Sequence, residues 1–265
     1  MPGRYPERIV CLTEETTETL YLLGEERRIV GISGYTVRPP RARQEKPRIS
    51  SFLSARIDKI AALKPDLVLG FSDLQADIAR DLAKAGLNIM IFNQGSVDEI
   101  LSMVLTLSSL TGSREKGEAL VGRLEAGLED MRQKAKAFPR RPRVYFEEWD
   151  EPMISGIRWV SELIEIAGGE DVLSELSRSP AASGRIHDGS QVIRRDPEVI
   201  LASWCGKKFR PERVAARPGW QDIAAVRESR LFEVKSADIL QPGPAALTDG
   251  VRRIHSVLAA FISSR

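Results

Sequence analysis

The sequence predicts an α/β protein built as two Rossmann-like α/β lobes joined by a single long helix. Three observations support this fold class. Short apolar strands alternate with helical segments in both halves of the 265-residue chain, which is the pattern of parallel sheets with crossover helices. Residues 113–137 interrupt that alternation with one long amphipathic helix. The segments 58–70 and 190–202 align without gaps, 132 residues apart, so the two halves of the chain resemble each other.

The first half of the chain contains four predicted strands with helices between them. We expect strands over residues 8–12, 29–32, 67–69 and 88–92, and helices over residues 13–24, 57–64, 74–82 and 96–110. Thr13 is expected to cap the first helix. In the third helix, Leu74, Ile78 and Leu82 have the spacing of one buried face. Residues 36–50 are rich in proline and charge, so they predict a loop.

The segment that joins the halves predicts one helix of about 35 Å at 1.5 Å per residue. Its apolar side chains form a single narrow stripe, made of Leu120, Leu124, Leu128, Met131 and Ala135. Such a helix is too long for a crossover within a small sheet and suits a strut between two lobes, although a long surface helix on one domain is the alternative. We therefore expect an N-terminal lobe over residues 1–112, the connecting helix over residues 113–138 and a C-terminal lobe over residues 139–265.

The second half repeats the order of strands and helices. We expect strands over residues 143–147, 199–203 and 231–234, and helices over residues 160–167, 220–224 and 244–261. In the internal match Pro65 aligns with Pro197, and an apolar triplet follows each of them. Because ligands of open parallel sheets bind beyond the carboxyl ends of the strands, two facing lobes would hold a ligand in the cleft between them.

The composition excludes several classes of protein. With 39 basic and 37 acidic residues the formal net charge is +2, so the chain is not a polybasic nucleic-acid clamp. No apolar run approaches the roughly 18 residues of a membrane span, which excludes direct membrane insertion. Cys11 and Cys205 cannot form a disulfide framework, and we expect them to be unbridged. The two histidines and two cysteines lack zinc-ligand spacing, and no phosphate-binding motif is present.

The first ten residues, MPGRYPERIV, do not contain a basic segment followed by an apolar one, so they do not resemble a signal peptide. Two interpretations stay open. If a signal peptide has been removed, the protein is periplasmic or otherwise extracytoplasmic. If Met1 is the native start, the protein is cytoplasmic.

Catalytic patterns are sparse. The one distinctive set of nucleophile and base is Cys205 with His187 or His255, and no short motif connects them. His255 lies within the terminal helix, where we expect it to pack against apolar neighbours. The acidic clusters at 13–18 (TEETTE) and 146–151 (FEEWDE) could supply carboxylate ligands or an acid–base pair, although a helix start favours acidic residues by itself.

Aromatic residues follow several of the predicted strands. Trp149 and Trp204 come after strands of the second half, whereas Tyr35 and Phe71 come after strands of the first half. Aromatic side chains at the carboxyl ends of strands would line the predicted cleft, and flat apolar walls with a few polar groups suit a large planar or ring-shaped ligand. The alternative is that each ring closes one end of a hydrophobic core.

These segments resemble the class III substrate-binding proteins of ABC importers. The resemblance covers nearly the whole chain, from RIVCLTEETTETLYLLGEERRIVGISGYTVRPP (8–40) and PRISSFLSARIDKIAALKPDLVLG (47–70) onward. In the second half, EEWDEPMISGIRWVSELIEIAGGEDVL (147–173), ASWCGKKFRPERV (202–214) and ILQPGPAALTDGVRRI (239–254) are similar to the cobalamin-binding branch. At the first strand, the family's S-x-P-S segment is replaced by Cys11-Leu12-Thr13-Glu14-Glu15.

The resemblance implies a non-enzymatic binding protein with the helical-backbone fold of this class, in which one long helix restricts the motion of the lobes. Cobalamin or a related corrinoid would lie in the cleft, with no intrinsic cofactor and no metal ligand from the protein. The implied ligand contacts are Tyr35, Phe52, Phe71, Trp149, Trp159, Trp204, Lys207 and Gln241. An ABC permease would dock at the lobe tips, with Asp77 and Glu212 as candidate contacts. The protein is expected to be a monomer that binds no nucleic acid.

Two alternatives stay open. Relatives with this scaffold bind ferric siderophores or haem, so the ligand could be another metal chelate; haem often requires a tyrosine or histidine axial ligand. A cytosolic enzyme or corrinoid-handling protein that has adopted the fold is the rival from another class.

Overall fold

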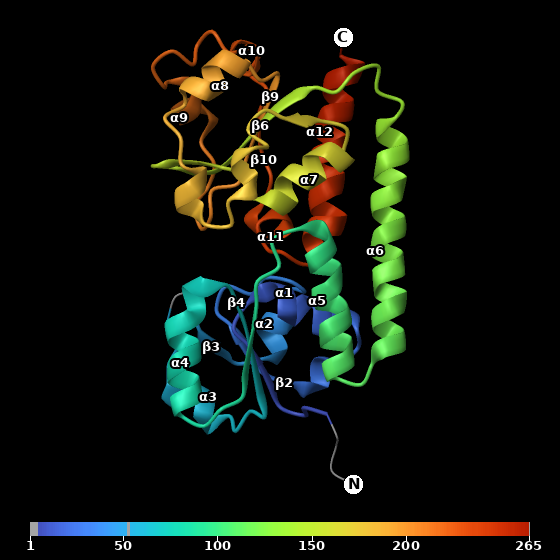
Figure 1. Cartoon of the computed structure of the whole chain (residues 1–265), viewed down its shortest axis with the longest axis vertical. Coiled ribbons are helices and arrows are strands. Elements are labelled where there is room, and N and C mark those ends of the chain that lie inside the picture. The colour runs from blue at the N-terminus through green and yellow to red at the C-terminus, as the bar shows by residue number, and fades with distance from the viewer. Residues whose placement is uncertain (1–4, 52–53, 265) are drawn as a thin grey trace. The chain divides into compact units, whose positions relative to one another are not determined.

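The computed structural model describes residues 5–51 and 54–264 of the chain (Figure 1). The chain divides into two compact units. Unit 1 comprises Met1–Gln94 and Asp98–Arg123, and unit 2 comprises Gly95–Val97 and Leu124–Arg265. The division falls within the long helix α6 (Arg114–Ala135), which confirms the predicted helix. The domain boundaries that we placed at residues 112 and 138 stay a prediction.

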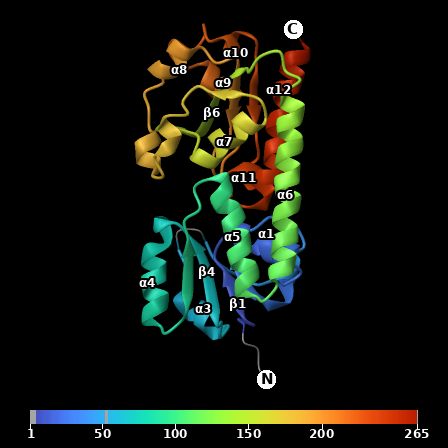
Figure 2. The same ribbon diagram turned by 45° about the vertical axis from the view of Figure 1, so that its right-hand side comes forward.

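Unit 1 contains a parallel sheet in the order β3-β2-β1-β4-β5. Its strands are β1 (Ile9–Cys11), β2 (Ile29–Ser33), β3 (Arg48–Ser50), β4 (Leu67–Phe71) and β5 (Ile89–Phe92). Its helices and helical turns are α1 (Glu14–Leu22), η1 (Glu26–Arg28), α2 (Ala42–Glu45), α3 (Ile57–Ala62), η2 (Asp73–Gln75), α4 (Ala76–Lys84) and α5 (Val97–Leu110). In both views, α3 and α4 lie on one side of this sheet and α1 and α5 lie on the other (Figures 1 and 2).

Unit 2 contains a mixed sheet in the order β10-β9-β6-β7, with β8 also paired to β6. Its strands are β6 (Arg143–Asp150), β7 (Met153–Ser155), β8 (Glu170–Asp171), β9 (Val199–Ala202) and β10 (Leu231–Glu233). Its helices and helical turns are α7 (Arg158–Ile166), η3 (Leu176–Arg178), η4 (Ala182–Arg185), α8 (Ser190–Arg195), α9 (Pro211–Ala215), α10 (Ala224–Arg227), α11 (Ser236–Ile239), the π-helical turn η5 (Ala246–Gly250) and α12 (Val251–Ser263). Together the two units confirm the predicted α/β class.

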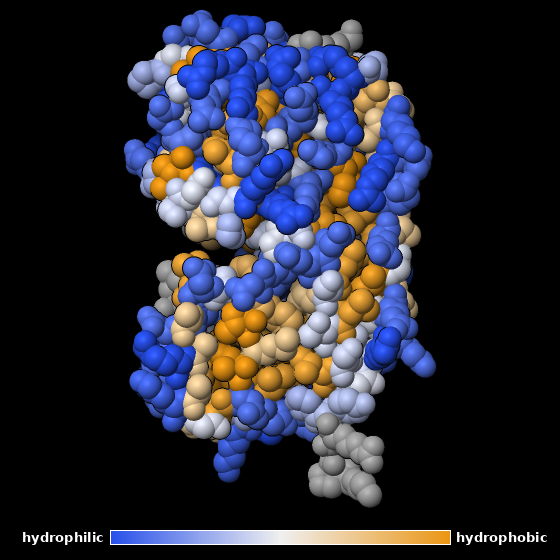
Figure 3. Space-filling view, viewed as in Figure 1, coloured by the Kyte–Doolittle hydropathy of each residue, from blue (hydrophilic) through white to orange (hydrophobic). Residues whose placement is uncertain are grey.

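Each unit buries apolar side chains between its sheet and helices. In unit 1, Val10 and Val68 of the sheet pack with Ile60 of α3 and Leu82 of α4. In unit 2, strand residues such as Ile200 pack with side chains from the segment that follows β9. Apolar side chains also gather on the visible surface of unit 1 around β5, the edge strand (Figure 3). Within the described part of the chain, no helix is long and apolar enough to cross a membrane.

The internal repeat predicted from the sequence is visible at the first strand of each sheet. The Arg8 Nε donates to the carbonyl oxygens of residues 63 and 64, both at 3.1 Å, where α3 ends. Likewise, the Arg143 Nε donates to the carbonyl oxygens of residues 195 and 196 at 3.2 and 3.0 Å, where α8 ends. The accepting positions are 132 residues apart, which is the offset of the sequence match.

A carboxylate completes the same arrangement in both units. Asp66 accepts a hydrogen bond from the backbone N–H of Arg8 at 3.0 Å, and Glu198, at the matching position, accepts one from the N–H of Arg143 at 3.1 Å. Lys64 and the matching Asp196 both have left-handed backbone, with φ of 47° and 44°. The two units therefore share one set of contacts, which links the first strand of each sheet to the turn before the strand that pairs with it in parallel (β4 or β9).

The structure differs from the sequence prediction in several places. Thr13 is the N-cap residue of α1 but makes no side-chain cap hydrogen bond, and β6 extends beyond the predicted strand to Asp150, where it pairs with the unpredicted β7. Residues 36–50 contain α2 and β3, because β3 adds an edge strand to β2 and the Tyr21 hydroxyl donates to Glu45 of α2 at 2.7 Å. Leu74 is 61% exposed and precedes α4, since Ser72 has a φ of 63° and starts a separate turn. Trp220 lies before α10 but is still buried, with its ring centroid 5.9 Å from that of Tyr145.

We predict that Arg8→Ala and Arg143→Ala each lower the free energy of unfolding by about 1–3 kcal/mol, because each removes hydrogen bonds from a charged donor to backbone carbonyls. Denaturant unfolding measures the effect, with Arg123→Ala on the exposed face of α6 as the matched control. Equal stability of Arg143→Ala and the control would contradict the role given to this arginine.

The two cysteines are both free thiols, with Cys11 buried in β1 and Cys205 exposed. Burial raises the pKa of the Cys11 thiol to about 12, and partial burial also raises the pKa of Cys205, but only Cys205 is accessible to a reagent. We therefore expect the native, non-reduced protein to show one thiol that reacts rapidly with a chromogenic disulfide, and the unfolded protein to show two. Two fast thiols in the native state, or none in the unfolded state, would contradict this placement.

Candidate functional site

The strand order of each sheet marks one place where a ligand can bind. In unit 1 the chain runs from β1 outward to β2 and β3 and then returns to β4 on the other side of β1. In unit 2, β8 and β9 lie on opposite sides of β6 and both run parallel to it. The chain order thus reverses between β1 and β4 and between β6 and β9. Loops diverge at such points and leave a crevice beyond the carboxyl ends of the strands.

At the carboxyl edge of unit 1, Tyr35 is the most exposed predicted site residue. It is 66% exposed and lies in the loop after β2, whereas Phe71, at the end of β4, is half-buried. The loop that carries Tyr35 is fixed to α1 by two hydrogen bonds. The backbone N–H of Val37 donates to Glu14 at 2.8 Å, and the Arg38 Nε donates to Glu18 at 2.8 Å. The acidic residues of α1 therefore position the loop.

At the carboxyl edge of unit 2, three of the predicted site residues lie together. The Lys207 Nζ is 4.0 Å from the ring centroid of Trp149 and 5.1 Å from that of Trp204. Trp149 is half-buried, and its indole N–H donates to the carbonyl oxygen of Glu151 at 2.8 Å. Trp204 is only 1% exposed. Trp149 and Lys207 thus form the accessible part of this cluster, and Trp204 lies beneath them.

The Lys207 ammonium also pairs with the buried carboxylate of Asp150, the last residue of β6. Arg213 of α9 approaches the second Asp150 oxygen at 3.3 Å. Although burial alone raises the pKa of Asp150, its contacts with Lys207 lower it overall, so this carboxyl stays ionised at neutral pH. The edge of unit 2 therefore combines an aromatic surface with a cation that is held in place by its counter-ion.

A buried polar network supports Trp204 from below. Glu147, which is fully buried in β6, accepts hydrogen bonds from the Trp204 indole at 2.9 Å and from both terminal nitrogens of Arg217 at 2.5 and 2.9 Å. The Tyr145 hydroxyl donates to the same carboxylate at 2.9 Å. One buried acid thus fixes the positions of an indole, a phenol and a guanidinium.

His187 extends this network and is not a metal ligand or a base in it. Its Nδ1 accepts from the backbone N–H of Gly189 at 3.1 Å, so its Nε2 carries the proton and donates to the Tyr145 hydroxyl at 3.0 Å. Burial, with the charge of Arg217, lowers the pKa of His187 to about 4, so the ring is neutral at neutral pH. Cys205 shares none of these hydrogen bonds, which leaves no cysteine–histidine pair here.

In the described part of the chain, the other predicted site residues form no hydrogen bond or ion pair with Tyr35, Trp149 or Lys207, although Glu212 is next to Arg213 in α9. Trp159 of α7 is buried, and its indole N–H donates to the carbonyl oxygen of Ile239 at 2.9 Å. Gln241 is half-buried after α11. Asp77 of α4 and Glu212 of α9 are exposed, and Asp77 pairs with Arg80 at 2.7 Å. Phe52 lies outside the residues that the structure describes.

Sequence reasoning missed the buried acids at both edges. Glu147 and Glu14 belong to the two acidic clusters that could supply carboxylate ligands or an acid–base pair, but neither is among the predicted ligand contacts. Their position in the sequence could have revealed them, because Glu147 lies in a strand predicted to be buried and Glu14 follows another such strand. A charged residue in such a place needs hydrogen-bond partners, which is a reason to expect a polar network around it.

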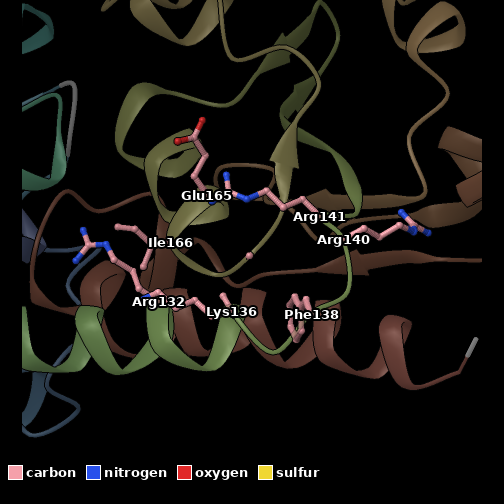
Figure 4. Close-up of a pocket in the computed structure, with 9 residues that line it drawn as sticks. Arg132, Lys136, Phe138, Arg140, Arg141, Glu165 and Ile166 are labelled. Carbon is pink, nitrogen blue, oxygen red and sulfur yellow. The ribbon is translucent and has the colours of Figure 1, made fainter.

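Unit 2 also contains a cavity of about 360 Å³ that none of the predicted residues line. It lies near the amino end of the sheet, since Arg141 precedes β6 and Gly168 precedes β8. Four basic residues line it, but Figure 4 shows Arg132 and Arg140 extending in opposite directions. Arg140 instead binds Glu198 through two hydrogen bonds of 2.6 and 2.7 Å. The cations do not converge on one point, so this cavity is not the candidate site.

Comparison with known proteins gives one matching family model, described as periplasmic binding protein, over residues 9–237. Among curated proteins, a vitamin B12-binding protein of Vibrio cholerae serotype O1 is 27% identical over 263 residues, covering 95% of this chain and 89% of that protein. An uncharacterised ABC transporter substrate-binding lipoprotein of Bacillus subtilis is 23% identical over 259 residues, covering 94% of this chain and 79% of that protein.

Solved structures show the same fold. The periplasmic vitamin B12-binding protein of Vibrio cholerae superposes with a TM-score of 0.77 at 24% identity, covering 98% of this chain and 99% of that chain. The periplasmic haem-binding protein of Roseiflexus sp. RS-1, in its apo form, superposes with a TM-score of 0.78 at 24% identity, covering 95% of this chain and 99% of that chain. Because these identities are low, the structural similarity establishes the fold.

We predict that Glu147→Ala lowers the free energy of unfolding by about 3–5 kcal/mol, because it leaves the guanidinium of Arg217 without its buried counter-ion. Glu212→Ala, which removes an exposed acid of the same unit, is expected to change it by less than about 0.5 kcal/mol. Denaturant unfolding of both variants provides the comparison. A Glu147→Ala protein as stable as Glu212→Ala would show that the network does not hold this edge together.

Proposed function

Since the chain belongs to the periplasmic binding protein family, we propose that it is the substrate-binding component of an ABC importer for cobalamin or a related corrinoid. The family consists of binding proteins, so the chain is a binding protein and not an enzyme. The observation that carries the choice of ligand is the alignment over 95% of the chain with a protein named for vitamin B12 binding. This is also the branch that the sequence resembles.

The two carboxyl edges support a large ring-shaped ligand. We propose Trp149, Lys207 and Gln241 of unit 2, and Tyr35 and Phe71 of unit 1, as candidate contacts with a corrinoid. Trp149 and Tyr35 offer flat apolar surfaces, and the Lys207 ammonium, already paired with Asp150, offers N–H donors to the carbonyl groups of a corrinoid. Trp204 and Trp159 are buried, so their proposed contribution is to hold the surface residues in position.

The partner in this proposal is the membrane permease of the importer. A binding protein that delivers a ligand to a permease works outside the cytoplasm, and one relative is named as a lipoprotein of this kind. Asp77 and Glu212 keep their role as proposed contacts with the permease, since both are exposed and on helices. The protein needs no cofactor of its own, because cobalamin brings its cobalt with it.

Haem is the second candidate ligand, and Tyr35 is the residue that favours it. An exposed phenol can serve as an axial ligand to haem iron. The histidines do not favour haem, because His187 uses both ring nitrogens and His255 stacks on Phe138 with its Nδ1 bonded to the Ala167 carbonyl at 3.0 Å. A ferric siderophore is a further member of the same ligand class.

Isothermal titration of the purified chain with cyanocobalamin, haemin and a ferric siderophore tests the proposal. We expect cyanocobalamin to bind tightest, and Trp149→Ala to weaken its binding by about 1–3 kcal/mol, the range for an aromatic residue at a binding site. Trp220→Ala is the matched control, because Trp220 packs on Tyr145 within the core of unit 2. It should lower the melting temperature and leave the affinity unchanged.

Two outcomes would overturn the proposal. If haemin binds and Tyr35→Phe abolishes the charge-transfer band of the complex, the ligand is haem. If no metal chelate binds to a folded protein, only membership of the family remains.

A further inference from the structure

The start of α1 is unusual because every residue from Thr13 to Thr19 is buried, including three glutamates. This segment follows β1 directly, so it lies beside the point where the strand order of unit 1 reverses between β1 and β4. A ligand that enters this crevice therefore meets the first turn of α1. Acidic side chains are common at helix starts, but they are normally exposed to water.

Two carboxyl groups in this turn have unused hydrogen-bonding capacity. Glu15 is 1% exposed; its Oε1 accepts from the Thr13 hydroxyl at 2.5 Å, but its Oε2 is buried and has no hydrogen-bond partner among the described residues. The Oε2 of Glu14 accepts from the N–H of Val37 at 2.8 Å, but the buried Oε1 is likewise unpartnered within the described chain. The Thr36 hydroxyl, next to Val37, is also buried and has no hydrogen-bond partner among the described residues.

Such atoms are costly, because a buried polar atom without a partner has lost its hydrogen bonds to water and gained none in return. All three atoms are buried and lack a partner among the described residues, and the segments that carry them follow β1 and β2, next to the point where the strand order reverses. A ligand that binds at this point would bring groups able to satisfy them. Glu14 and Glu15 lie in the first turn of α1, and Thr36 lies in the loop after β2, next to Tyr35. These atoms are therefore candidates for the polar end of a binding site.

The charges around the pair decide which ligand group fits. Glu18 of the same helix adds negative charge, and Arg38, whose charge acts on Glu14, also binds Glu18. Cys11 of β1 lies beside Glu15, and Lys46 acts on Cys11 from beyond α2. Burial raises the pKa of Glu14 to about 8 and that of Glu15 to about 7. Near neutral pH these carboxyls therefore exchange between a neutral form, which donates and accepts, and an anionic form, which only accepts.

We propose that Glu14 and Glu15 form a selectivity element that accepts a carboxamide of the ligand and rejects a carboxylate at the same position. A primary amide offers an N–H donor and a carbonyl acceptor, which matches a neutral carboxyl group on both counts. A ligand carboxylate offers only acceptors and brings a second negative charge to a site that already holds three acidic groups. This inference rests on the proposed corrinoid function, since a corrinoid carries amides at its rim whereas haem carries carboxylates.

The test compares two corrinoids that differ in these groups, dicyanocobinamide with amide side chains and dicyanocobyrinic acid with carboxylates. Binding of each to the full chain is measured by calorimetry between about pH 6 and about pH 9, the range that brackets both raised pKa values. We expect the affinity ratio of amide to carboxylate ligand to rise by about tenfold or more over this range, because deprotonation of the pair adds repulsion toward the carboxylate ligand alone. In Glu14→Gln/Glu15→Gln the ratio should stay constant within about twofold.

Glu118→Gln, an exposed acid of α6, is the control and should behave like the wild type. A second measurement needs no ligand. Because burial raises the pKa of both carboxyls above their unfolded values, the folded state binds protons that the unfolded state has released. The free energy of unfolding should therefore fall as pH rises from about 5 to about 8 in the wild type, and less so in the double variant.

The outcomes separate this inference from the proposed function. If dicyanocobinamide binds but the ratio is flat with pH in the wild type, or rises equally in the double variant, the selectivity role is wrong and the corrinoid function stands. If neither corrinoid binds, the proposed function itself fails. A double variant that does not fold is replaced by Glu15→Gln alone, for which at least half of the logarithmic change in the ratio should be lost.

Discussion

Parallel pairing between the first and fourth strands of each unit is the constraint on which the rest of this structure depends. The pairs are β1 with β4 and β6 with β9. At the amino end of each pair, an arginine at the start of the first strand (Arg8 or Arg143) donates hydrogen bonds to backbone carbonyl oxygens at the end of the helix that leads into the second strand of the pair. Because these stabilising contacts lie at the amino ends of the strands, the side chains of the loops at the carboxyl ends can differ between the two units. The repeated set of contacts explains why two segments 132 residues apart share a pattern although their surroundings differ.

The side chains at the two carboxyl edges do differ. Unit 2 presents an indole and an ammonium group, Trp149 and Lys207, above a buried network centred on Glu147. Unit 1 presents the exposed Tyr35 on a loop that is held by the acids of α1. One edge thus supplies an aromatic surface with donors, and the other supplies an aromatic surface beside carboxyl groups. The proposed corrinoid, with a flat ring and a rim of neutral polar groups, offers suitable partners for each of these sets of groups.

Hydrophobic periodicity was sufficient to predict most of the fold, because buried strands and amphipathic helices leave a regular signal. Periodicity gave a wrong prediction where something other than hydrophobic spacing determines the local structure. Leu74 has helical spacing but precedes α4, and β3 lies in a segment with the composition of a loop. For the site, the position after a predicted strand indicated Trp149 and Trp204, whereas Lys207 was implied only by the family resemblance. The position after a strand could not tell that Trp204 would be buried, because burial depends on how far the neighbouring loop folds over the ring. The role of Glu147 also escaped notice, since its partners are distant in sequence.

The central claim is that the carboxyl edges of both sheets, and not the basic cavity at the other end of unit 2, receive the ligand. Hydrogen exchange of the full chain with and without cyanocobalamin tests this most directly, since it reports protection segment by segment. The account predicts slower exchange in residues 33–38, after β2, and in residues 203–209, after β9, with little change in residues 132–141. Protection confined to residues 132–141 and 165–168 would contradict it and move the ligand to the cavity.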